Sequence, residues 1–270
     1  METQFIFMLG IILLLGLCFG SLANVLIYRI PREIPLGLFK KTRSFCPACE
    51  KTIPFYHNLP VISYFLLKGK CASCGVKISS RYPWVEFLTA LIWCLSFTVF
   101  YRSQEWDFSD WYFYGQLAVE LYFIYALFVI VYIDIDFRII PDRFSWGNWV
   151  IALLYVFIFK DNTLEHVLGG VFGFGTFFLL AWGYEKWRGV EGLGMGDVKM
   201  MGWLGTWVGF SSVPLLVIIA SLSGSIVGFW NMRKSGEGMQ TAIPFGPFLA
   251  LGAYLVWLYQ NSQFSLPGLH

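Results

Sequence analysis

The chain has 270 residues, of which 57% are hydrophobic and only 13% are charged, with 27 glycines. A soluble domain carries about 25% charged residues and about 7% glycine, so this composition is typical of a protein that crosses a membrane several times. It argues against a disordered chain, a secreted disulfide scaffold and a cytosolic globular enzyme. The formal net charge of +2 gives no indication of a nucleic-acid-binding protein.

Apolar segments of membrane-spanning length follow one another along the chain. The first, residues 5–27, carries no charge and is long enough to cross a hydrocarbon layer of about 30 Å as a helix. We interpret it as a retained transmembrane helix, because a cleaved signal peptide has a shorter apolar stretch behind a basic segment. Further spans are predicted at residues 84–101, 111–133, 144–159, 167–184 and 242–260.

Residues 200–232 form a longer uncharged segment. Its 33 residues would make a helix of roughly 50 Å, which is too long for one span. Ser211, Ser212 and Pro214 offer a break, and a division there predicts about eight spans in total. Because the first half is short, the sequence leaves open whether both halves cross the membrane completely.

The basic residues favour one orientation, because Lys and Arg beside membrane helices are retained on the cytoplasmic side. With the N-terminus outside, alternating spans place 17 of the 19 Lys and Arg residues in cytoplasmic segments. Ten of them fall in residues 28–83, the one long polar insertion. This insertion is too small to build a hydrophobic core easily, so we expect a covalent or metal link within it.

Four cysteines in this insertion form two CxxC pairs, Cys46 with Cys49 and Cys71 with Cys74, separated by 21 residues. Four thiolates on two tight turns are typical of a structural tetrahedral Zn²⁺ site. The reducing cytoplasm disfavours disulfides there, which leaves a pair of redox CxxC motifs as the alternative. A site with four cysteine ligands has no open position for catalysis, so the zinc is predicted to be structural.

Acidic residues beside apolar segments suggest a second site, because a charge at the bilayer centre costs about 2.5–3.5 kcal/mol. Asp134, Asp136 and Asp142 follow the third predicted span, and Asp197 precedes residues 200–232. The predicted topology places all four at the cytoplasmic face. Two carboxylates that share a proton can activate water and protonate a leaving amine. Asp134 and Asp136 point to opposite faces of a helix, so only one of them can meet Asp197 if the helix continues.

Each of these residues also has a structural interpretation. Asp142 follows Pro141 and suits the first turn of a helix, whereas Asp197 can pair with Lys199 or cap its own helix. Carboxylates that couple ion or proton movement in a transporter are the main functional alternative. Glu86 and Glu120 fit either function.

The chain resembles the type IV prepilin peptidases, bacterial inner-membrane aspartic proteases that are also called prepilin leader peptidase/N-methyltransferases. The resemblance extends over nearly the whole chain: residues 20–31, the four cysteines, residues 59–64, 69–71, 78–86, the 134–142 cluster, the GMGD motif of residues 194–197 and the PFGPFLA motif of residues 244–250. It implies that Asp134 and Asp197 are catalytic, with Asp136, Asp142 and Lys199 auxiliary.

The resemblance also implies the substrates, which are prepilins and the pseudopilins of type II secretion. Their short basic leader is cut on the cytoplasmic side, and the apolar helix that follows stays in membrane lipid. The new amino terminus is then methylated by S-adenosylmethionine, for which Glu86 is the candidate cofactor-binding residue. A homodimer is left open, and a non-enzymatic scaffold of a pilus or secretion apparatus is a further alternative.

The sequence thus predicts an all-α polytopic membrane protein in the bacterial inner membrane, with its active site at the cytoplasmic face. Residues 1–28 are expected to form the first transmembrane helix. Residues 29–83 are expected to form a cytoplasmic zinc-binding domain associated with methylation, and residues 84–270 the aspartic peptidase domain.

Overall fold

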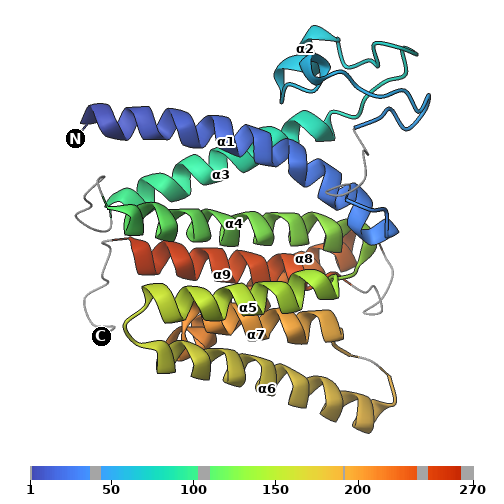
Figure 1. The fold of residues 1–270 in the computed structure, drawn as a ribbon. Helices are drawn as coiled ribbons and strands as arrows, with labels where there is room; N and C mark the ends of the chain where they lie inside the picture. Colours follow the sequence, from blue (N-terminus) through green and yellow to red (C-terminus); the bar gives the residue numbers. More distant parts are fainter. Residues whose placement is uncertain (1, 37–43, 103–109, 191, 236–242, 263–270) are drawn as a thin grey trace. The chain divides into compact units, whose positions relative to one another are not determined.

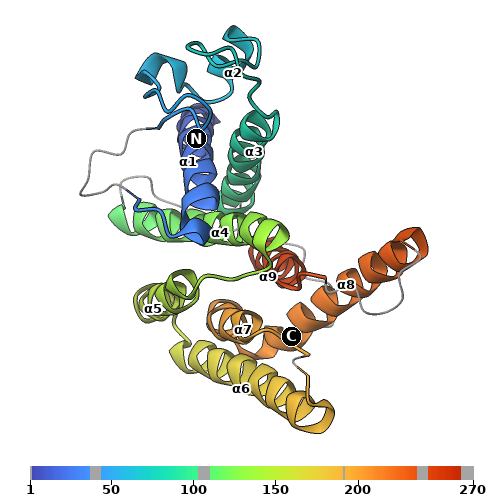
Figure 2. The same ribbon diagram turned by 90° about the vertical axis from the view of Figure 1, so that its right-hand side faces the viewer.

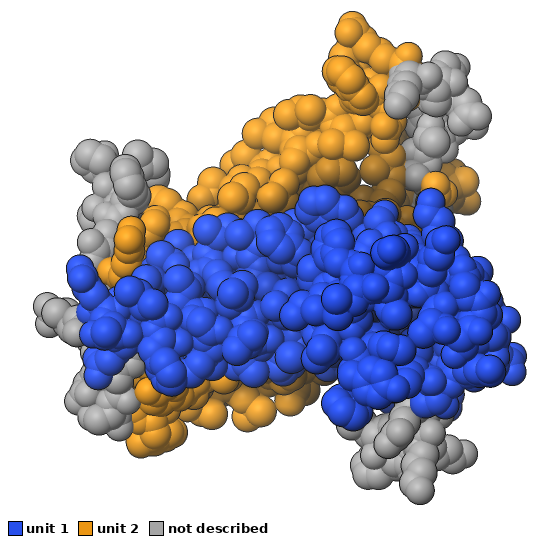
Figure 3. Space-filling model, turned by 90° about the horizontal axis from the view of Figure 1, so that it is seen from above, with its two compact units in different colours: residues 1–101 blue, residues 102–270 orange. Residues whose placement is uncertain are grey.

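The computed structural model describes residues 2–36, 44–102, 110–190, 192–235 and 243–262. Within these ranges the chain is helical, with two isolated β-bridges as the only extended pairing. Contacts divide the chain into two compact units, residues 1–101 and 102–270, which are coloured separately in Figure 3. Each unit is described below by itself. The predicted all-α class is confirmed for the described ranges.

The first unit contains two long helices, α1 (Glu2–Arg29) and α3 (Arg81–Arg102), which run side by side in opposite directions (Figure 1). A Cβ atom at Gly16 would lie 2.6 Å from the Cα atom of Ala90, and one at Gly20 would lie 2.5 Å from the Cα atom of Glu86. The two glycines are four residues apart, so they lie on one face of α1. This close approach of two backbones through small residues is typical of helices that pack inside a membrane.

In the described residues between these helices, 30–36 and 44–80, the helices are short: η1 (Ile30–Arg32), η2 (Phe55–His57) and α2 (Ile62–Leu66). The two isolated bridges pair Phe45 with Thr52 and Lys70 with Lys77. Each bridge therefore encloses one CxxC pair in a tight loop. With so little regular structure, this segment has a small apolar core, as the sequence predicts.

The second unit contains α4 (Trp111–Phe137), α5 (Asp142–Phe159), α6 (Thr163–Arg188), α7 (Met195–Val208), η3 (Phe210–Ser212), α8 (Val213–Ser235) and α9 (Gly246–Asn261). Helix α7 lies among α5, α6 and α9 (Figures 1 and 2). All residues of α7 from Met200 to Val208 are buried. A helix that is apolar on every side must be enclosed by other helices, so α7 is the centre of this unit.

Helices α6 and α7 pack backbone against backbone. A Cβ atom at Gly169 would lie 2.3 Å from the carbonyl oxygen of Gly205, and one at Gly205 would lie 2.2 Å from the carbonyl oxygen of Gly169. No side chain fits at either position without moving a helix. The glycines therefore set the distance between α6 and the helix that carries Asp197.

A buried polar cluster joins α4, α5 and α9. Glu120 of α4 is only 2% exposed and accepts hydrogen bonds from the Tyr155 hydroxyl and the Trp257 indole. The sequence marks Glu120 as an acidic residue within a span but does not identify these donors. Both carboxylate oxygens are engaged, so the cluster links three helices without leaving an unpaired acceptor.

Five described helices are long and apolar enough to cross a membrane: residues 2–32, 81–102, 111–137, 163–188 and 210–233. The predicted number of about eight is not confirmed. Helices α7 and α9 have 14 and 16 residues, or about 21 and 24 Å, which is short of a hydrocarbon core of about 30 Å. Ala242, where the last predicted span begins, lies outside the described residues.

The predicted break in residues 200–232 is confirmed. Helix α7 ends at Val208, the short helix η3 holds Ser211 and Ser212, and α8 begins at Val213 just before Pro214. Gly209 supplies the turn with φ of +85°, which a residue with a side chain rarely adopts. The break leaves α7 as a short central helix and α8 as a full candidate span.

We predict that Gly169→Ala destabilises the protein, because the added methyl group meets the backbone of Gly205. Overpacking of this kind costs about 1–3 kcal/mol, which outweighs the roughly 0.5–1 kcal/mol that alanine contributes in a helix. The matched control is Gly175→Ala on the same helix, where a Cβ atom meets nothing within 4 Å. Thermal unfolding in detergent measures both variants. Equal midpoints would contradict the backbone-contact argument.

Candidate active site

Asp134 lies in the last turn of α4 and faces the protein interior. It is 5% exposed, whereas Asp136 is exposed. Helix α4 continues to Phe137, so residues two apart must point in opposite directions. The expectation that only one of these aspartates turns inward is therefore confirmed, and that aspartate is Asp134.

The chain turns sharply where α4 ends, three residues after Asp134. Arg138 ends α4 in the left-handed conformation, with φ of 56°, and its N–H donates to the Asp134 carbonyl at 2.8 Å. Ile140 then becomes buried. A Cβ atom at Gly196 would lie 3.0 Å from the Ile140 Cβ atom, and one at Gly246 would lie 3.2 Å from its Cδ1 atom. Ile140 thus packs against the first turns of both α7 and α9.

The N-terminus of α9 provides a direct partner for Asp134. The backbone N–H of Gly246 donates to Asp134 Oδ2 at 3.0 Å. A Cβ atom at Gly246 would lie only 2.7 Å from the same oxygen. The N–H groups at a helix start have no partner within the helix, and their dipoles favour a negative charge. This contact therefore stabilises the ionised form of Asp134.

Asp197 lies in the first turn of α7, outside the five candidate spans. Gly194 is the N-cap of this helix, and a Cβ atom there would lie 3.4 Å from Oδ2 of Asp197. Burial, and then the negative charge of Asp134, raise the pKa of Asp197 to about 7. The charge of Asp134 therefore acts on Asp197, although the two residues are 63 apart in the sequence. A group with this pKa holds a proton for much of the time near neutral pH.

Lys199 does not pair with Asp197. Its Nζ atom lies 2.6 Å from Oδ1 of Asp142 in the first turn of α5. The local pairing of Lys199 with Asp197, one alternative from the sequence, is thus not what the structure shows. The ion pair instead joins the first turns of α5 and α7. Asp142 lies in the first helical turn, as predicted, but Pro141 holds the N-cap position.

The four cysteines Cys46, Cys49, Cys71 and Cys74 come together in the first unit. Their sulfur atoms all lie within 4.8 Å of one another, and the Cys46 and Cys74 sulfurs are 3.9 Å apart. Tetrahedral Zn²⁺ with Zn–S bonds of about 2.3 Å requires sulfurs roughly 3.8 Å apart. None of the four forms a disulfide. The donor set and its spacing fit zinc.

Backbone turns hold these thiols in place. Within each loop an N–H donates back to the first cysteine, from Glu50 to the Cys46 carbonyl at 2.8 Å and from Gly75 to the Cys71 carbonyl at 2.9 Å. The backbone N–H groups of Cys74 and Ser73 lower the pKa of the Cys71 thiol to about 6. The thiolate is the form that binds metal, so the turn prepares this ligand.

Glu86 has a clear structural contact within the first unit. It is 9% exposed, and its Oε2 atom accepts the backbone N–H of Val61 at 2.7 Å. Ser21 of α1 is also hydrogen-bonded to it. Val61 has φ of +60°, an unfavourable conformation for a β-branched residue. Glu86 therefore connects Val61, which lies between the two CxxC pairs, to α1 and α3.

Sequence reasoning did not identify the role of Gly246 or Ile140. The PFGPFLA motif contains Gly246 and was part of the resemblance, but only the fold reveals that its N–H meets a carboxylate 112 residues away. Ile140 lies between Asp134 and Asp142 in the sequence. Its neighbour Ile139 is equally apolar but exposed, so the sequence does not indicate which of the two packs inward.

The fold and this site define a helical membrane protein with an interacting pair of aspartates and a separate four-cysteine cluster. Residues 14–100 match the family model of the bacterial peptidase A24 N-terminal domain, and residues 121–229 match that of the type IV leader peptidase family. The two matches fall in the first and second compact units respectively. No solved structure gave a significant match.

Curated relatives match over almost their full length. A prepilin leader peptidase/N-methyltransferase of Pseudomonas aeruginosa is 33% identical over 92% of this chain and 89% of its own. A protein of the same name from Legionella pneumophila is 31% identical over 95% of this chain and 93% of its own. A type 4 prepilin-like proteins leader peptide-processing enzyme of Escherichia coli is 37% identical, over 92% and 93%. The chain belongs to the type IV leader peptidase family.

We predict that Cys71→Ser releases zinc and lowers the thermal midpoint of the purified protein. Loss of one thiolate leaves an incomplete tetrahedral site, and the small segment around it has little other stabilisation. Elemental analysis should give about one zinc per chain before the change and far less after it. Cys18→Ser is the matched control, because Cys18 is an exposed residue of α1 outside the cluster. Wild-type protein purified without chelators and found free of zinc would contradict the assignment.

Proposed function

We propose that this chain cleaves the leader peptide from prepilins and type II secretion pseudopilins and then methylates the new amino terminus. The observation that supports the peptidase assignment is that burial and the negative charge of Asp134 raise the pKa of the Asp197 carboxyl group to about 7. Three helix ends, those of α4, α7 and α9, meet at this pair. The names of the full-length relatives support both activities.

The environments of the two aspartates suggest different roles. Asp134 accepts the Gly246 N–H and serves as the ionised base, whereas Asp197 carries the shared proton. Asp134 removes a proton from water as the water oxygen attacks the scissile carbonyl carbon. Asp197 donates to the carbonyl oxygen and stabilises the tetrahedral intermediate. The C–N bond then breaks: the proton held by Asp134 passes to the leaving amine, and Asp197 takes back a hydroxyl proton as the carbonyl group re-forms.

The position of the site suits a substrate that is partly in the membrane. Asp134 lies at the end of the candidate span 111–137, so a scissile bond there reaches water while an apolar helix stays in lipid. The distribution of Lys and Arg places this end at the cytoplasmic face of the inner membrane, with the N-terminus outside. The basic leader would then remain in the cytoplasm.

The cysteine cluster serves a structural purpose in this proposal. Zn²⁺ bound by Cys46, Cys49, Cys71 and Cys74 would stabilise the cytoplasmic domain of residues 29–83, and residues 84–270 would form the peptidase domain. S-adenosylmethionine supplies a methyl group on a sulfonium centre. Among the described residues we identify no set that fits this cofactor, so Glu86 stays the candidate from resemblance and no step is assigned to it.

We predict that Asp134→Asn and Asp197→Asn each reduce leader cleavage at least roughly 1,000-fold, because an amide cannot exchange the shared proton. The exposed Asp161→Asn variant is the matched control for an aspartate change elsewhere. Mass spectrometry of a purified prepilin incubated with enzyme and S-adenosylmethionine measures loss of the leader and gain of one methyl group. Normal cleavage by either asparagine variant, with a thermal midpoint like that of the wild type, would remove that residue from the pair.

We predict that cleavage slows as pH rises through about 7. The raised pKa of Asp197 means that its proton is present below this value and is lost above it, and the proposed mechanism requires the proton. Initial cleavage rates of wild-type protein in detergent across pH 5.5 to 9 would test this, with thermal midpoints taken at each pH. A rate that rises steadily over this range would contradict the assignment of Asp197 as the proton carrier.

A further inference from the structure

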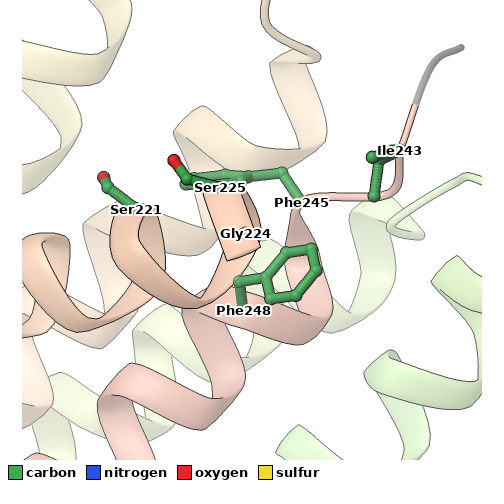
Figure 4. Close-up of a pocket in the computed structure, with 6 residues that line it drawn as sticks. All are labelled: Ser221, Gly224, Ser225, Ile243, Phe245 and Phe248. Atoms are coloured by element: carbon green, nitrogen blue, oxygen red, sulfur yellow. The ribbon is translucent and has the colours of Figure 1, made fainter. Parts of the chain in front are cut away.

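A cavity lies beside the proposed active site, between α8 and the start of α9. Its volume is about 360 Å³. Figure 4 shows Phe245 and Phe248 on one side, with the small residues of α8 on the other. The lining consists of Ser221, Gly224, Ser225, Ile243, Phe245 and Phe248.

The chain path connects this cavity to the catalytic carboxylate. Phe245 lines the cavity, and the next residue, Gly246, donates its N–H to Asp134. Phe245 is therefore the chain neighbour of the residue whose backbone contacts the Asp134 carboxylate. Phe245 is held in place by ring contacts with Phe177 of α6 and with Phe248. The cavity wall nearest the catalytic site is thus built from packed aromatic side chains.

The lining indicates the chemistry of the occupant. Among the described residues of the lining, the polar side chains are the serine hydroxyls and none is charged. Glycine and serine on one face of α8 leave room, because no large side chain projects from them. Aromatic walls and a volume near the lower end of ligand pockets, roughly 300–1,000 Å³, suit one apolar side chain with a short stretch of backbone.

We propose that this cavity binds the apolar side chain that immediately follows the scissile bond, and thereby helps to select the cleavage position. This inference rests on the proposed function. In the part of the chain that the structure describes, no carboxylate lines the cavity to pair with the Lys or Arg of a basic leader. The apolar helix on the other side of the bond does suit it.

The surroundings of the cavity favour entry of a helix from lipid. Residues 210–233 form a candidate span of which only 17% is buried, and Ser221 and Ser225 are exposed. They are four residues apart and share one face of α8, where small side chains allow a second helix to approach closely. A substrate helix beside this face would present its first side chain to the cavity and its scissile bond to the aspartates.

The test is to fill the cavity with Gly224→Leu. A Cβ atom at this position would lie 3.4 Å from Phe248 and 3.7 Å from Phe245, which is ordinary contact, so the added side chain can extend into the cavity. Purified prepilins with Phe, Leu or Ala directly after the scissile bond serve as substrates. We expect kcat/KM for the Phe substrate to fall roughly 10-fold to 200-fold, with much less change for Ala. The ratio of kcat/KM for the Phe substrate to kcat/KM for the Ala substrate should therefore be lower in Gly224→Leu than in the wild type.

Two further variants make the result specific. Gly175→Leu on α6 is the matched control, because a Cβ atom there meets nothing within 4 Å and the residue does not line the cavity. It should leave the ranking of the three substrates unchanged. Phe248→Ala enlarges the cavity and should improve cleavage of a Trp substrate relative to the Phe substrate. Thermal midpoints of all variants show that they fold.

The outcomes separate this inference from the proposed function. If wild-type protein cuts none of the prepilins, the proposed function fails. If it cuts them and Gly224→Leu changes all substrates by the same factor, the cavity does not bind this side chain, and a lipid chain is then the occupant that remains. A substrate-dependent loss with Gly224→Leu, together with the opposite shift in Phe248→Ala, supports the inference.

Discussion

The free-energy cost of burying a carboxylate in apolar surroundings determines how helices α4 and α9 of the second unit pack against each other. At the centre of a bilayer this cost is about 2.5–3.5 kcal/mol for one acidic group, so each such group needs a donor. Helix α4 carries two, and α9 supplies a donor to both: the Trp257 indole to Glu120 and the Gly246 N–H to Asp134. The order of these contacts makes the two helices antiparallel. They are fixed at two points about 21 Å apart along α4.

Glycine residues allow the remaining helices of the second unit to pack close to α4 and α9. The Gly169 and Gly205 backbones touch, which brings α7 close to α6 and leaves the N-terminus of α7 at the site. At Gly246 a side chain would collide with the Asp134 carboxylate itself. The catalytic arrangement therefore depends on backbone groups as much as on the two aspartates. This explains why a chain with few charges can still position ionisable groups accurately.

Much of this arrangement follows from local sequence patterns. The break near Ser211, the inward orientation of only one of Asp134 and Asp136, and the convergence of four cysteines were all predictable, because helix period and ligand spacing are local properties. The Gly246 contact was not, because it joins residues 112 apart. The number of spans was also not fixed, since hydropathy does not distinguish lipid-facing helices from α7, which is enclosed by protein.

The order of the two proposed reactions follows from the chemistry of nitrogen. In the scissile amide the nitrogen lone pair is delocalised into the carbonyl group, so it is a poor acceptor of a methyl group. Hydrolysis by Asp134 and Asp197 releases a free amine, whose lone pair can attack the methyl carbon of a sulfonium donor. Methylation must therefore follow cleavage. Because both activities reside in one chain, the product amine meets its second reaction at a high effective concentration.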